Sequence, residues 1–109
     1  MDKQNFKAMI SEVEKIMSLK EVYLFGSYAY GTPNKDSDYD IYFVTDKIDG
    51  RKHDAIVAIY DVIDDIRDKP VDVLLNTKEH FDNRKNYKGT FEYKIAKEGI
   101  RLYEQRNVW

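Results

Sequence analysis

The chain has 109 residues, enough for one domain with a buried core but too few for a separate substrate-binding domain. Hydrophobic residues make up 42% of it, which argues against intrinsic disorder, and the absence of cysteine excludes disulfides and thiolate chemistry. A net charge of −2 excludes the strongly basic surface typical of nucleic-acid-binding proteins, so we expect no direct nucleic-acid binding.

The hydropathy pattern gives no sign of export or membrane insertion. The first residues lack the apolar segment of a signal peptide, and no apolar run approaches membrane-spanning length. We therefore expect a cytoplasmic protein without membrane contact, folded as a single domain over residues 1–109.

The N-terminal third predicts a helix, a strand and a short second helix. Apolar residues first recur at helical spacing, at Phe6, Met9, Ile10, Val13, Ile16 and Met17. The apolar run 22–25 ends at Gly26 and is typical of a buried strand. Ser27 is then predicted to be a helix N-cap, because its hydroxyl can accept a hydrogen bond from a free backbone N–H. The composition of residues 31–37 predicts a loop.

Strands and helices alternate in the middle of the chain. Residues 39–45 are rich in β-branched and aromatic side chains, as strands are. An apolar stripe over 56–66 predicts a helix that Pro70 ends, and residues 71–75 predict a third strand.

The C-terminal part predicts two further helical segments and a last strand. Residues 78–87 are interpreted as a short helix and a loop. Thr90 is expected to cap a last helix that ends at Gly99, and residues 100–103 to form an edge strand. The alternation of strands and helices indicates an α/β layer structure.

Two carboxylates share one face of the second predicted strand. Asp38 and Asp40 are two residues apart, so their side chains point the same way, with α-carbons roughly 7 Å apart. Two ionised carboxylates at about 6 Å repel each other by about 3 kcal/mol at an effective dielectric of 20. A bound Mg²⁺ would replace this repulsion with attraction of both carboxylates to the cation. The alternative is turn chemistry around Asp36 and Asp38, which does not account for Asp40 beside an apolar strand.

A third carboxylate, Asp72, lies between Val71 and Val73 in a segment otherwise suited to the core. Burying a lone carboxylate there would be costly, so two strands with mid-strand carboxylates suggest a shared cation. His53 and His80 are isolated in the sequence, and zinc is not expected.

The pair Gly26-Ser27 follows a predicted strand directly. Free backbone N–H groups at such a turn can bind phosphate, although a tight turn with an ordinary serine cap is the simpler interpretation of this pair alone. Together with the paired aspartates, it indicates a metal-dependent site for a nucleoside triphosphate.

The spacing of these motifs resembles the nucleotidyltransferase superfamily related to DNA polymerase β. A Gly-Ser pair, ten residues and then Asp-x-Asp, with a later strand aspartate, matches that family's pattern. The short chain resembles its minimal branch, whose members often act as antitoxins beside a HEPN-domain toxin. The resemblance implies a nucleotidyltransferase fold with a small mixed β-sheet flanked by helices.

The resemblance also implies roles for individual residues. Gly26 and Ser27 would bind the triphosphate of ATP, and Asp38, Asp40 and Asp72 would be the catalytic carboxylates that hold two Mg²⁺ ions. The implied reaction is transfer of AMP from ATP to an acceptor hydroxyl on a partner HEPN-type toxin.

Position 30 departs from the family pattern. Many minimal members have an arginine immediately before the second glycine, where this chain has Tyr30. The alternative function is therefore a non-catalytic antitoxin or nucleotide-binding module that acts by occluding its partner.

Overall fold

The computed structural model describes residues 3–31, 33 and 36–105. In chain order the elements are α1 (Lys3–Glu14), β1 (Leu19–Phe25), α2 (Ser27–Tyr30), β2 (Tyr39–Thr45), α3 (Lys52–Ile63), β3 (Val71–Thr77), α4 (Lys78–Arg84), α5 (Phe91–Glu98) and β4 (Ile100–Glu104).

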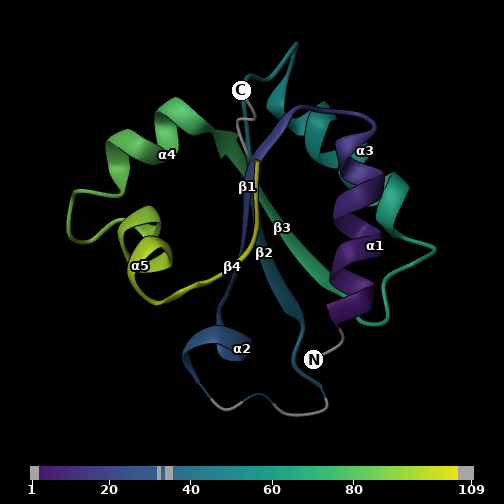
Figure 1. The fold of residues 1–109 in the computed structure, drawn as a ribbon, viewed down its shortest axis with the longest axis horizontal. Coiled ribbons are helices and arrows are strands. Elements are labelled where there is room, and N and C mark those ends of the chain that lie inside the picture. Colours follow the sequence, from purple (N-terminus) through teal and green to yellow (C-terminus); the bar gives the residue numbers. More distant parts are fainter. Residues whose placement is uncertain (1–2, 32, 34–35, 106–109) are drawn as a thin grey trace.

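The four strands form one mixed sheet in the order β3-β2-β1-β4. β1 pairs antiparallel with both β2 and β4, whereas β2 and β3 are parallel and are connected through α3. Figure 1 shows α1 and α3 on one side of the sheet and α4 and α5 on the other. This arrangement confirms the predicted small mixed sheet flanked by helices.

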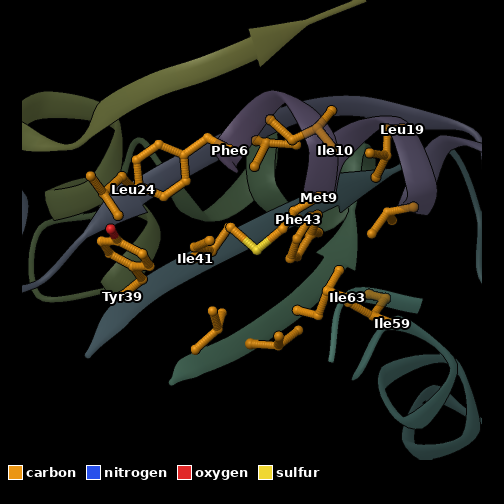
Figure 2. Close-up of a cluster of buried hydrophobic side chains, with 14 of the residues drawn as sticks. Phe6, Met9, Ile10, Leu19, Leu24, Tyr39, Ile41, Phe43, Ile59 and Ile63 are labelled. Atoms are coloured by element: carbon orange, nitrogen blue, oxygen red, sulfur yellow. The ribbon is translucent and has the colours of Figure 1, made fainter. Parts of the chain in front are cut away.

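The larger core lies between the sheet and the α1–α3 layer. Alternate strand residues point into it, because successive strand side chains face opposite ways. The side chains labelled in Figure 2 belong to it: Phe6, Met9, Ile10, Leu19, Leu24, Tyr39, Ile41, Phe43, Ile59 and Ile63. Aspartates 40 and 72 occupy the intervening strand positions, so they face the other side of the sheet.

A smaller core lies under α4 and α5. It contains Tyr23, Tyr42, Val44, Phe81 and Ile95, and the Phe81 ring lies 5.2 Å from that of Tyr23 and 5.3 Å from that of Tyr42. These contacts hold α4 on the face that carries Asp40 and Asp72.

Two elements differ from their predicted bounds. β1 begins at Leu19 rather than at residue 22, because its buried Glu21 is compensated by Lys78 Nζ at 3.1 Å and by the Tyr23 hydroxyl, which donates at 2.7 Å. α3 ends at Ile63, well before Pro70. At β1 the compensating cation comes from α4, so a tertiary contact supports the longer strand.

The predicted end signals of α5 are confirmed. The Thr90 hydroxyl accepts a hydrogen bond from Tyr93 N at 3.0 Å, and Gly99 is the C-cap. β4 then forms an edge of the sheet, as expected. No helix in the part of the chain that the structure describes is long and apolar enough to cross a membrane.

Candidate active site

Gly26 forms the turn between β1 and α2 with φ 71° and ψ −152°, a conformation that is essentially restricted to glycine. A Cβ atom built on Gly26 would collide with the carboxylate of Asp40. Glycine is therefore required here twice, for its backbone angles and for the space that Asp40 occupies.

Ser27 is not the helix N-cap, so that prediction is wrong. Gly26 takes the cap position without a side-chain hydrogen bond, and Ser27 is the first helical residue. The positive φ at the end of β1 explains the difference, since only glycine enters this turn readily and the helix begins directly after it. The Ser27 side chain therefore has no capping role in α2.

Backbone hydrogen bonds close the turn, and one ring contact holds α2 against the sheet. Ala29 N and Tyr30 N both donate to Gly26 O, at 3.0 and 2.9 Å. The ring of Tyr28 packs against that of Tyr39 in β2, with centroids 4.9 Å apart. The turn is thus tied to the strand that carries Asp40.

Asp40 and Asp72 lie side by side on neighbouring strands. They are paired in the parallel register of β2 and β3, which places both side chains on the α4–α5 face of the sheet. Phe25, the residue before Gly26, is paired with Asp40 on the other side. The structure therefore brings the Gly26 turn together with two of the three predicted carboxylates, Asp40 and Asp72.

The electrostatics of the pair are unfavourable without a cation. Burial raises the pKa of Asp40, and the charge of Asp72, a hydrogen bond between the two carboxyl groups and the charge of Asp38 act in the same direction. Asp40 is half-buried, whereas Asp38 and Asp72 are exposed. Asp38 lies immediately before β2, rather than on it as the sequence pattern predicts, and its charge acts on Asp40 from that position.

The donor chemistry fits a hard cation such as Mg²⁺. The donors that the structure brings together here are carboxylate oxygens, and His53 lies on α3 across the sheet while His80 faces Glu92 at 3.8 Å. Within residues 3–31, 33 and 36–105, however, no three acidic or histidine side chains are grouped closely enough to hold a metal ion by themselves. A cation here would need further ligands from a bound substrate.

Tyr30 connects this site to α5. Burial raises the pKa of its hydroxyl to about 12, the charges of Glu98 and Asp40 act in the same direction, and a backbone hydrogen bond from Gly26 opposes them. Lys94 Nζ lies over the Tyr30 ring, 4.7 Å from its centroid. Lys94 cannot be recognised from the sequence, because its neighbours along the chain do not distinguish it from other lysines on a polar helix face.

Three solved structures share the fold. A candidate nucleotidyltransferase from Sulfolobus solfataricus is 22% identical, with a TM-score of 0.64 over 94% of this chain and 80% of that one. A mutant form of the MntA-HepT toxin–antitoxin and a toxin–antitoxin with AMP-PNP are each 18% identical, with TM-scores of 0.62 and 0.58. Each of these two matches covers 97% of this chain and 76% of the other. At these identities the likeness shows the fold.

Comparison with curated proteins found no match. The model of the nucleotidyltransferase domain family matches residues 7–102, which include the Gly26 turn, the aspartates and α5. The match extends over most of the chain and reaches every strand of the sheet. The chain therefore belongs to the nucleotidyltransferase domain family.

Proposed function

We propose that this domain transfers AMP from ATP to a hydroxyl group of a partner protein and thereby acts as an antitoxin. The observation that supports this most strongly is the placement of Asp40, which lies between Asp72 on β3 and the Gly26 turn. A triphosphate held at the turn would have its α-phosphorus within reach of the paired carboxylates.

Under this proposal the predicted site residues divide the binding between them. Gly26 and Ser27 contact the triphosphate, and Asp38, Asp40 and Asp72 hold divalent cations. Mg²⁺ typically takes one or two protein carboxylates and completes its shell with water and substrate phosphates. That preference suits a site in which two carboxylates are adjacent and the third is exposed nearby.

The reaction is an in-line displacement at phosphorus. The acceptor oxygen forms a bond to the α-phosphorus, the bond from that phosphorus to the bridging oxygen breaks, and pyrophosphate leaves. Bound cations supply charge neutralisation for the triphosphate and the carboxylates. Asp72 lies on β3, at an edge of the sheet, and is exposed, so it is suited to accept the proton of an incoming hydroxyl.

The partner is proposed to be a HEPN-type toxin. Two of the structures that share this fold are toxin–antitoxin assemblies, one of them with AMP-PNP. The acceptor side of the proposed site is open at the edge strand β3, so a partner could present a hydroxyl there. Because ATP is the proposed substrate, we expect the domain to act in the cytoplasm.

The decisive experiment combines the domain, ATP, Mg²⁺ and a candidate HEPN-type toxin. Intact-mass spectrometry should show the toxin gaining one or more AMP groups, with loss of its ribonuclease activity. The Asp40→Asn variant should leave the toxin unmodified and active. If Asp40→Asn silences the toxin as well as the wild type does, with no mass change, the domain acts by occlusion and the proposed transfer is wrong.

A further inference from the structure

A lysine from the C-terminal part of the chain lies against the helix that follows the Gly26 turn. Lys94 extends from α5, and its ammonium is 4.7 Å from the centre of the Tyr30 ring. Tyr30 ends α2 and is joined to the turn by its N–H, which donates to Gly26 O at 2.9 Å. The contact therefore places a cation next to the proposed triphosphate site.

Tyr30 is suited to hold a cation in this position. Its side chain is half-buried, and its hydroxyl lies near the Gly26 backbone and within the electrostatic influence of Glu98 and Asp40. The hydroxyl stays protonated at neutral pH, so the ring offers an uncharged aromatic face to Lys94. A lysine over such a face is attracted by the negative face of the ring.

The charge of Lys94 is not neutralised by a carboxylate within ion-pair distance among the residues that the structure describes. By contrast, two cations at the end of α4 are paired: Arg84 lies 3.1 Å from Glu92, and Lys85 lies 3.1 Å from Asp82. Lys94 is exposed and also lines a pocket of about 610 Å³ along α5. Its ammonium is thus available to an anionic ligand.

The position of α5 indicates which part of a triphosphate Lys94 would meet. α5 leads into β4, which pairs with β1, whereas Asp72 lies on β3 at the opposite edge of the sheet. A triphosphate with its α-phosphorus near Asp40 and Asp72 would direct its terminal phosphates toward the β1 side. The terminal phosphates carry negative charge, so a cation on the β1 side would offset it.

We propose that Lys94, positioned by the ring of Tyr30, contacts the terminal phosphates of the bound nucleoside triphosphate. This inference rests on the proposed function, because it assumes that a triphosphate binds at the Gly26 turn. It assigns to α5 a direct part in substrate binding and to Tyr30 a positioning role.

Binding titrations in Mg²⁺ with ATP, AMP and inorganic tripolyphosphate test the inference. Lys94→Met should weaken ATP and tripolyphosphate binding about tenfold, as expected for loss of one charge-assisted contact, and leave AMP binding unchanged. The loss should shrink as ionic strength rises, since salt screens an exposed charge. Tyr30→Leu should show the same ligand pattern, whereas Tyr30→Phe, which keeps the ring, should retain affinity.

Lys97→Met is the matched control. Lys97 lies one turn further along α5, over the ring of Tyr93 at 5.4 Å, and lines the same pocket. Its removal should change no affinity by more than about twofold. Equal losses in both lysine variants, or none in Lys94→Met, would overturn the inference while leaving the proposed function standing. Failure of the wild type to bind either ATP or tripolyphosphate would overturn both.

Discussion

The carboxylate of Asp40 occupies the space that a side chain at position 26 would need. Gly26 and Asp40 are therefore a matched pair, formed where the end of β1 meets β2. The same contact holds Asp40 beside the turn and next to Asp72. A single close approach thus joins the proposed phosphate-binding and carboxylate parts of the site.

Gly26→Ala should destabilise the fold and abolish nucleotide binding. Alanine would have to adopt φ 71°, at a cost of about 1–3 kcal/mol, and its Cβ would displace the Asp40 carboxylate. Gly31→Ala is the control, because Gly31 is extended and a Cβ atom added there would lie 3.8 Å from its nearest neighbour, Ser27 O. Urea denaturation and ATP titration would measure both effects. Equal stability of the two variants would show that the Gly26–Asp40 contact is not tight.

Asp40→Asn and Asp72→Asn should separate catalysis from folding. Each removes one charge from an unfavourable pair, so we expect a higher melting temperature in the presence of a chelator. Under the proposed function, AMP transfer should fall by about a hundredfold or more, since each variant would lose a charge beside the reacting phosphate.

Asp61→Asn provides the comparison for that prediction. Asp61 is exposed on α3, on the opposite side of the sheet. Its substitution should change neither the melting temperature nor the rate of AMP transfer. A clear drop in melting temperature for Asp40→Asn and Asp72→Asn would instead assign these carboxylates a structural role.

Much of the site can be predicted because its residues are close in sequence or lie on strands. Asp72 stands out because a carboxylate is unusual between two valines, and Asp40 because it adjoins an apolar strand run. Asp38 lies just before β2, so strand alternation does not account for its position. The adjacency of Asp40 and Asp72 needs only the parallel pairing of β2 with β3. The local sequence pattern and the fold class together are therefore sufficient to predict that Asp40 and Asp72 are adjacent.

The contacts of α5 cannot be predicted from the same reasoning. Lys94 and Tyr30 are 64 residues apart, and their contact depends on how α5 packs beside α2. Glu92 is likewise unremarkable in the sequence, since a glutamate near a helix N-terminus is usually solvated. It is buried because Tyr42, from a strand, and Arg84, from α4, both donate to it.

Glu92 should make the stability of the domain depend on acid pH. Burial alone would raise its pKa, but hydrogen bonds from Tyr42 at 2.8 Å and Arg84 at 3.1 Å lower it overall. Because the folded-state pKa lies below the unfolded one, its stabilisation is complete above about pH 4.3 and is lost as the pH falls through the folded pKa. Glu92→Gln should cost about 1.5–3 kcal/mol at pH 7, and less at pH 3. Denaturation at several pH values would measure this, and a pH-independent difference would contradict it.

Ser27→Ala should weaken nucleotide binding without destabilising the protein. Gly26 is the N-cap of α2, so removing the Ser27 hydroxyl breaks no cap, and alanine favours the helix slightly. The proposed contact of that hydroxyl with the triphosphate would be lost, at about 1 kcal/mol or roughly fivefold in affinity. Ser11→Ala, on the exposed face of α1, should leave ATP affinity unchanged. Thermal melts and ATP titrations of both variants test this prediction. Unaltered ATP affinity in a folded Ser27→Ala protein would remove Ser27 from the proposed site. A large loss of stability would show that the hydroxyl supports the turn instead.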